Sequence, residues 1–129
     1  MKIEHIAIWV KNLETMKNFY CKYFNGKAND KYINHTKGFS SYFISFHSGA
    51  RLEIMHSNKL NNLEFDSLKE RFGFIHLAIS TGSKNNVNEL TQLLEKDGYS
   101  IMSHPRTTGD GYFESCVLDP ENNQIEITI

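Results

Sequence analysis

Two apolar segments, far apart in the chain, carry the same polar interruption, and this repeat limits the fold more than any other feature. The segments read IEHIAIWV and GFIHLAIS, and each contains a His-x-Ala triplet, beginning at His5 and at His76. The two histidines are 71 positions apart, and two glutamates in later apolar segments, Glu53 in RLEIM and Glu126 in QIEITI, are 73 positions apart. Because self-similarity at a nearly constant spacing marks a repeated structural unit, the chain is predicted to contain two copies of one module.

Hydrophobic periodicity predicts the same order of elements in each copy. The first copy reads as a strand at 3–10, a helix that starts after Asn12 and stops at Asn25-Gly26, an extended stretch at 27–33, and a hairpin with arms at 41–46 and 51–56. The second copy reads as a strand at 74–80, a helix marked by Val87, Leu90 and Leu94 and closed by Gly98, an extended stretch at 99–103, and a hairpin with arms at 112–118 and 124–129.

The predicted fold class is therefore α+β, built from duplicated βαβββ modules. A chain of 129 residues is long enough for one domain with a buried core. We divide it into module one at 1–57, a connector at 58–71 with one short helical turn, and module two at 72–129. With a helix on the outside of each module, we expect a curved mixed sheet that encloses a metal-containing cavity.

Four polar residues of the repeat are predicted to share the concave face of this sheet, because side chains alternate between the two faces of a strand. They are His5, Glu53, His76 and Glu126. Enclosed carboxylates are costly unless they are paired or bind a cation. Imidazole nitrogen together with carboxylate oxygen suits Zn²⁺, Ni²⁺, Co²⁺, Fe²⁺ or Mn²⁺, whereas calcium prefers oxygen alone. A single strand His or Glu is more often a core or surface residue, so the metal hypothesis depends on the repeated pairing.

Composition excludes several classes of partner. The chain has 14 Lys and Arg against 15 Asp and Glu, with no basic stripe, which argues against a nucleic-acid or anionic-membrane surface. We expect no signal peptide and no membrane-spanning segment. Cys21 and Cys116 are interpreted as free thiols of a cytoplasmic protein. The four other histidines have no repeat partner and are predicted to lie at the surface.

Four segments resemble the signatures of the vicinal oxygen chelate superfamily, which includes glyoxalase I, methylmalonyl-CoA epimerase, extradiol dioxygenases, fosfomycin-resistance thiol transferases and bleomycin-binding proteins. The segments are IEHIAIWVKNLETMKNFYCKYF, ARLEIM, GFIHLAIS and LDPENNQIEI, and the last is the most specific. Glyoxalase I fills the four ligand positions with His, Glu, His and Glu, the set that this chain resembles at His5, Glu53, His76 and Glu126. Epimerases tend to carry Gln at the position of Glu53, and bleomycin-binding members lack the ligands.

The resemblance implies a metal-dependent, glyoxalase I-like lyase of the lactoylglutathione lyase type, which detoxifies methylglyoxal. The hemithioacetal of a 2-oxoaldehyde and a thiol would become a 2-hydroxyacyl thioester through an enediolate. By the same resemblance Ni²⁺ or Co²⁺ is favoured over Zn²⁺, Fe²⁺ or Mn²⁺, and Glu126 is favoured over Glu53 as the base. Two other functions stay open: an epimerase-like isomerase and a small-molecule or drug-binding resistance protein.

The identity of the thiol also stays open. Short bacterial glyoxalases that use glutathione carry an Arg on the first strand where this chain has Trp9. An indole has neither the positive charge of a guanidinium nor its paired N–H donors for a carboxylate. Arg106 and Tyr112, in PRTTGDGYFES, are candidate replacements and complete the predicted substrate-binding set with Trp9. The resemblance further implies a homodimer, with each metal site formed within one chain or across two.

Overall fold

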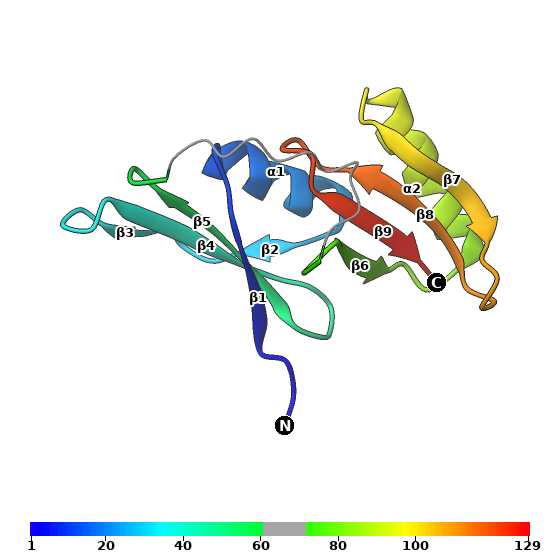
Figure 1. Cartoon of the computed structure of the whole chain (residues 1–129), viewed down its shortest axis with the longest axis horizontal. Coiled ribbons are helices and arrows are strands. Elements are labelled where there is room, and N and C mark those ends of the chain that lie inside the picture. The colour runs from blue at the N-terminus through cyan, green and yellow to red at the C-terminus, as the bar shows by residue number, and fades with distance from the viewer. Residues whose placement is uncertain (61–71) are drawn as a thin grey trace. The chain divides into compact units, whose positions relative to one another are not determined.

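In the computed structural model of the chain, residues 1–60 and 72–129 are described, and they divide between two units, Met1–Glu64 and Phe65–Ile129. Each unit contains one helix packed on a mixed β-sheet (Figure 1). The predicted α+β class is confirmed. Of the predicted connector at 58–71, with its helical turn, positions 61–71 lie outside the described residues.

Six elements lie within residues 1–60 of the first unit. They are β1 (His5–Trp9), α1 (Leu13–Tyr23), β2 (Lys27–Ala28), β3 (Tyr32–Asn34), β4 (Phe39–Ser45) and β5 (Arg51–Ser57). The sheet order is β1-β5-β4-β2, and β3 also pairs with β4. Strands β1 and β5 are parallel, whereas β2, β3 and β5 are antiparallel to β4.

The single extended stretch predicted at 27–33 is wrong in one respect, because it is divided between β2 and β3. Asn29 lies at the break, where its backbone N–H donates to the carbonyl of Phe43 at 3.0 Å. Its side-chain oxygen accepts the Phe43 N–H at 2.8 Å, so the amide side chain takes a place that a backbone carbonyl would otherwise fill.

Helix α1 begins and ends as the sequence predicts. The Asn12 side chain accepts the Thr15 N–H at 3.0 Å, which satisfies one of the unpaired donors of the first turn. Asn25 has φ +53°, and the Gly26 N–H donates to the Tyr20 carbonyl at 3.2 Å. The buried face of the helix follows its helical period and consists of Leu13, Met16, Phe19, Tyr20 and Tyr23.

The second unit repeats this plan. Its elements are β6 (His76–Ser80), α2 (Lys84–Lys96), β7 (Ile101–Thr107), β8 (Phe113–Leu118) and β9 (Gln124–Thr128). The sheet order β6-β9-β8-β7 is the order of the first unit, with β6 in the place of β1 and β9 in the place of β5. The predicted duplication of a βαβββ module therefore holds for the order and pairing of the strands.

The prediction for the strand after α2 is wrong in length, because β7 runs to Thr107 and not to position 103. Pro105 lies inside it, and a proline cannot donate to a β-ladder. Strand β7 tolerates it because this strand is at the edge of its sheet, where the pairing with β8 also shifts register between Ser103 and Arg106.

Each sheet has an aliphatic face toward its helix. Leu52, Ile54, Ile125 and Ile127 are at most 2 % exposed, and they alternate with the polar residues of β5 and β9. Burial of these side chains fixes the register, since a slip of one residue would turn them outward. Among the described residues, no helix has the length and apolar character needed to cross a membrane.

Candidate metal centre

The strand register puts the predicted ligands in the same place in both units. In the first unit the parallel pairing of β1 with β5 sets Ala7 opposite Glu53. In the second unit β6 pairs with β9 in the same way and sets Ala78 opposite Glu126. The small alanine side chain leaves room above the sheet, and the histidine two residues earlier lies diagonally across from the carboxylate.

The structure brings His5 and Glu53 together. The Nε2 atom of His5 lies 3.9 Å from a carboxylate oxygen of Glu53, whose side chain is only 15 % exposed. The ring of Phe43, cross-strand neighbour of Glu53, contacts the imidazole edge-on with centroids 5.3 Å apart. Thus one nitrogen of His5 faces the carboxylate across a gap that is too long for a hydrogen bond.

A carboxylate that we did not predict orients this imidazole. The Nδ1 atom of His5 and an oxygen of Glu4 are 2.5 Å apart, and Glu4 also pairs with Arg51. The pKa of Glu4 is held below its ordinary value by the hydrogen bond with His5 and by Arg51. Ligating histidines commonly bond their second nitrogen to a carboxylate, which fixes the tautomer and leaves the other nitrogen free for a metal.

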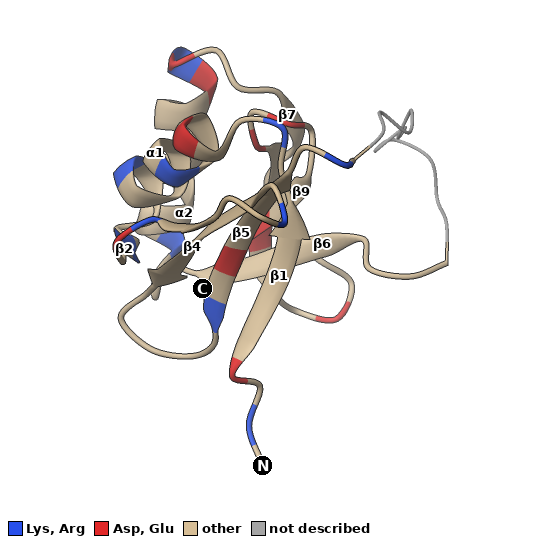
Figure 2. Cartoon of the chain, turned by 90° about the vertical axis from the view of Figure 1, so that its left-hand side faces the viewer, with Lys and Arg blue, Asp and Glu red and all other residues tan. Residues whose placement is uncertain are grey.

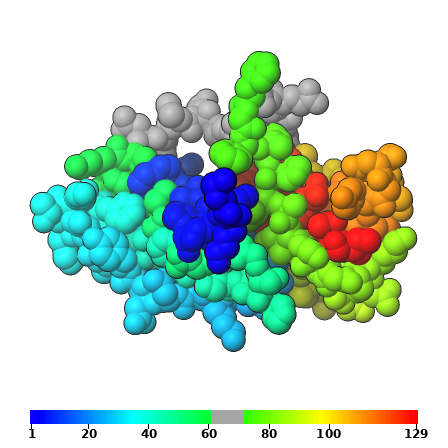
Figure 3. All heavy atoms as spheres, turned by 90° about the horizontal axis from the view of Figure 1, so that it is seen from below, coloured from blue at the N-terminus to red at the C-terminus, as the bar shows by residue number. Residues whose placement is uncertain are grey.

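These residues lie at an accessible end of the first sheet. The N-terminal residues before β1, darkest blue in Figure 3, lie on the surface, and Ile3 is exposed. In Figure 2 the ribbon of β1 carries no charged residue, while β5 carries a basic and then an acidic position. The basic position is Arg51, the register partner of His5, so the ion pair with Glu4 follows from the pairing of the two strands.

The second unit brings His76 and Glu126 together. Their Nε2 and carboxylate oxygen atoms are 3.4 Å apart, and the Glu126 side chain is 21 % exposed. Among the described residues, neither Glu126 nor Glu53 has an ion pair with a lysine or arginine. Each of the two largely covered carboxylates thus has an imidazole beside it.

Glu126 has acidic and thiol neighbours that sequence reasoning missed. Cys116 is the cross-strand partner of Glu126 on β8, and Glu114, two residues earlier on β8, is close enough to Glu126 for the two carboxylates to interact. Burial, and then the charge of Glu126, raise the pKa of Glu114, and burial likewise raises the pKa of the Cys116 thiol. The alternation in FESCVL, with Ser115 and Val117 buried, was the signal that could have placed Glu114 and Cys116 on this face.

The three predicted substrate-binding residues differ in their surroundings. Trp9 lies on the same face of β1 as His5 and is 50 % exposed. Arg106 lies 3.7 Å from Glu114, its cross-strand partner, so its charge is turned toward a carboxylate of its own sheet. Tyr112 is exposed and follows a turn in which the Thr108 N–H donates to its carbonyl at 2.8 Å.

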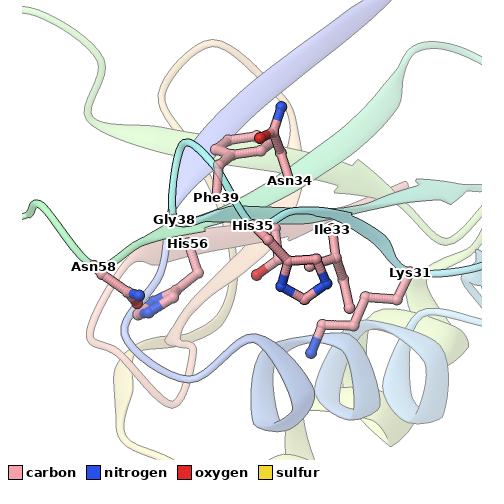
Figure 4. A pocket seen from close by; sticks show the side chains of 9 residues that line it. Lys31, Ile33, Asn34, His35, Gly38, Phe39, His56 and Asn58 are labelled. Carbon is pink, nitrogen blue, oxygen red and sulfur yellow. The ribbon is translucent and has the colours of Figure 1, made fainter.

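A separate pocket lies on the helix side of the first unit (Figure 4). His56 lines it and is half-buried, with Nδ1 3.0 Å from the Val10 carbonyl, so the prediction that His56 lies at the surface is wrong. Figure 4 shows His35, His56 and Lys31 on the side of α1, whereas Phe39 projects from the other side of the strands. The side chains of His35, His56 and Lys31 therefore do not share the face that carries His5, although Phe39 also lines the pocket.

The donor atoms of each His–Glu pair suit a divalent metal ion. Each pair offers one imidazole nitrogen and one carboxylate, the mixed donor set that Zn²⁺, Ni²⁺ and Co²⁺ accept. Neither unit, within its described residues, gathers three or more His, Cys, Asp or Glu side chains in a metal-holding group. The four-ligand set of His5, Glu53, His76 and Glu126 stays a prediction.

Comparisons with known proteins agree with this fold. The family model of the Glyoxalase/Bleomycin resistance protein/Dioxygenase superfamily matches residues 2–127. The uncharacterized protein YqjT of Bacillus subtilis (strain 168) is 26 % identical over 128 residues, which are 97 % of this chain and 96 % of that protein.

Two solved structures show the same architecture. A glyoxylase/bleomycin resistance protein/dioxygenase domain from Frankia sp. EAN1pec is 17 % identical, with a TM-score of 0.83 over 100 % of this chain and 97 % of the other. The trypanothione-dependent glyoxalase I of Leishmania major is 21 % identical, with a TM-score of 0.74 over 99 % and 86 %. At these identities the likeness shows the fold alone.

The chain belongs to the Glyoxalase/Bleomycin resistance protein/Dioxygenase superfamily, the vicinal oxygen chelate superfamily. The resemblance read from the four sequence segments is thereby confirmed at the level of the superfamily. Because members of one fold carry out different chemistry, the fold alone does not define the activity of this chain.

Proposed function

We propose that this protein is a metal-dependent, glyoxalase I-like lyase. Its substrate is the hemithioacetal of a 2-oxoaldehyde, such as methylglyoxal, with a thiol, and its product is a 2-hydroxyacyl thioester. The observation that supports this is the equivalent placement of a His and a Glu in both modules, with Glu53 and Glu126 each opposite the alanine of a His-x-Ala triplet. Of the functions open to the superfamily, glyoxalase I resembles this set of four residues most closely.

His5, Glu53, His76 and Glu126 would hold the ion, supplied by one chain or by two. We favour Ni²⁺ or Co²⁺, with Zn²⁺, Fe²⁺ or Mn²⁺ as alternatives. When bound, such an ion supplies electrostatic stabilisation of negative charge that develops on the substrate oxygens. The contact of Glu4 with Nδ1 of His5 supports this role, because it leaves Nε2 as the nitrogen that faces Glu53.

The carboxylates would move the proton. In the reaction a base removes a proton from C1 of the hemithioacetal and returns it to C2, so that the atoms of substrate and product balance. Glu126 is the favoured base and Glu53 the second candidate. The Glu126 side chain is 21 % exposed, and this partial cover suits the work because it limits the access of bulk water to a base that must act on carbon.

Metal analysis of the purified protein, together with an assay of methylglyoxal loss with several thiols, tests the proposal. Glu126→Gln keeps the size of the side chain but removes its charge, so turnover should fall by about 10²- to 10⁴-fold while metal content falls less. His76→Ala should empty the site. His104→Ala is the matched control, because His104 forms a His–Glu pair with Glu95 at 3.0 Å outside the repeat.

Near-normal turnover of the Glu126→Gln protein with metal bound would contradict the assignment of Glu126 as the base. Two results would contradict the metal-dependent lyase itself: full activity after chelation, and a protein that never binds metal. The last would favour a binding protein in which His76 and Glu126 simply form an ion pair at 3.4 Å. Racemisation of a carbon acid without use of any hemithioacetal would favour the epimerase-like alternative.

We also propose a cytoplasmic homodimer, and subunit mixing tests where its sites form. His5→Ala and His76→Ala homodimers should each lack activity. If a site uses module one of one chain and module two of the other, the mixed dimer keeps one intact site and regains activity. If each site lies within one chain, the mixed dimer stays inactive, and sedimentation of a monomer with full activity would contradict the dimer.

A further inference from the structure

Three aromatic rings lie together on the face of the first sheet that carries His5 and Glu53. Trp9 and Phe39 contact edge-to-face, with centroids 6.0 Å apart and an interplanar angle of 89°. Phe39 contacts Tyr32 with centroids 6.1 Å apart. We call Trp9, Phe39 and Tyr32 the aromatic patch.

The strand register places this patch on the face of the candidate ligands. Trp9 alternates with Ile8 and shares its face with Ala7 and His5. Tyr32 pairs with Ser41, which in turn pairs with Met55, two residues beyond Glu53. Figure 4 shows Phe39 on the side of the strands opposite to α1.

The patch is open to solvent and uncharged. Trp9 is 50 % exposed and Tyr32 is 53 % exposed. Its neighbours on this face are Met55, Ser57 and Asn34, whose amide nitrogen lies 3.3 Å from the Tyr32 hydroxyl. In the described strands of this unit, no lysine or arginine stands among the neighbours of the patch on this face. A contiguous apolar surface of this kind commonly marks a binding site. The strand residues that directly border the patch include no cation that would attract a carboxylate, and Arg51, farther along the same face, pairs with Glu4.

We propose that the aromatic patch binds an aromatic or branched apolar group carried by the thiol half of the substrate. This inference rests on the proposed glyoxalase I-like function. Trp9 lies four residues from His5, about 13 Å along the strand, and its partner Met55 lies two residues from Glu53, about 7 Å. At these distances the patch lies away from the reacting carbons, where the far end of a thiol adduct would lie. Edge and face contacts between rings favour an aromatic guest.

Direct binding tests this without reference to turnover, because Trp9 is the single tryptophan of the chain. Its fluorescence, excited where tyrosine does not absorb, should change on titration with benzyl mercaptan. The same concentrations of glutathione, an anionic tripeptide thiol, should leave it unchanged. Equal responses to the two thiols, or a response to glutathione alone, would overturn the inference.

Two adjacent residues of β3 provide a matched pair of variants. Tyr32 and Ile33 are 53 % and 50 % exposed but point to opposite faces of the strand. Tyr32→Ala should weaken binding of benzyl mercaptan by about 10-fold, the scale of one lost aromatic contact. Ile33→Ala should leave it unchanged. Equal effects of the two substitutions would overturn the inference, because they would indicate a general loss of order in the strand.

Two further results separate this inference from the proposed function. Binding of benzyl mercaptan without turnover of any hemithioacetal would overturn the lyase proposal and leave the patch as an apolar binding site. Turnover with glutathione but no binding of benzyl mercaptan would do the reverse. If a second copy of the chain covers the patch, Trp9 fluorescence will depend on protein concentration and not on thiol, which also overturns the inference.

Discussion

Replacement of Glu4 by glutamine should weaken metal binding although Glu4 is not among the predicted ligands. Glu4 lies 2.5 Å from Nδ1 of His5 and is fixed on its other side by Arg51. An ionised acceptor forms a hydrogen bond about twice as strong as a neutral one, so the amide keeps part of the contact. Loss of a carboxylate behind a ligating histidine commonly lowers metal affinity by about 10- to 100-fold.

The geometry places Glu4→Gln at the lower end of that range. The side chain is more than half exposed, so water competes for the same nitrogen and a change of about 10-fold is expected. Glu4→Ala removes the contact entirely and should approach about 100-fold. Competition with a chromogenic chelator, with Ni²⁺, Co²⁺ and Zn²⁺ in turn, measures the affinity.

Glu14→Gln is the control, because Glu14 is a half-exposed glutamate of the same unit that pairs with lysines and not with a candidate ligand. A second readout needs no metal. Ring-nitrogen NMR shifts at a pH where His5 is neutral should show the proton on Nδ1 in the natural chain and a shift toward Nε2 in Glu4→Gln. Unchanged affinity and an unchanged tautomer would refute the argument that Glu4 orients His5.

Three further predictions concern stability. The hydrogen bond from Lys17 helps to lower the pKa of Glu14 from 4.5 to about 2, so the stabilisation from ionised Glu14 is present above the unfolded pKa and is lost as pH falls from about 5 to 2. Screening at this half-exposed site limits that stabilisation to about 1 kcal/mol. The difference in urea midpoint between the natural chain and Glu14→Gln across this pH range measures it. Gly26→Ala would place a Cβ 2.5 Å from the Cγ2 methyl carbon of Ile44 and should destabilise by about 1–3 kcal/mol, with partial recovery when Ile44→Leu is added, because leucine lacks the Cγ2 methyl. Asn12→Ala should cost about 1 kcal/mol by loss of the cap of α1, and no change in thermal midpoint would contradict this.

The sequence predicts the faces of the strands well because burial has a strict period of two. Leu52 and Ile54 are buried while Glu53 between them stays partly open, and the same alternation recurs around Glu126. Periodicity alone does not indicate which polar strand residues belong to a site. The repeat does, because the His and Glu at equivalent positions of the two modules lie on the same face of each sheet. Within each module the structure brings the His and the Glu together, at 3.9 and 3.4 Å.

The features that the sequence did not predict depend on strand register or on the sheet edge. Strand β7 continues past Ser103 through Pro105, and it accepts a proline because it lies at the edge of its sheet. Glu114 becomes a neighbour of Glu126 only through the pairing of β8 with β9. Arg51 reaches Glu4 only because β1 and β5 are parallel and bring residues 47 positions apart side by side.

The two modules keep the same candidate ligands but surround them differently. Beside Glu53 the strand β4 presents Phe43, whose ring also lies 4.2 Å from the guanidinium carbon of Arg51. Beside Glu126 the equivalent strand β8 presents Cys116, with Glu114 close by. One carboxylate therefore has an aromatic and cationic setting and the other an acidic one. A reaction that needs one group to hold an ion and another to carry a proton benefits from such inequality, because two identical carboxylates could not be specialised for the two roles.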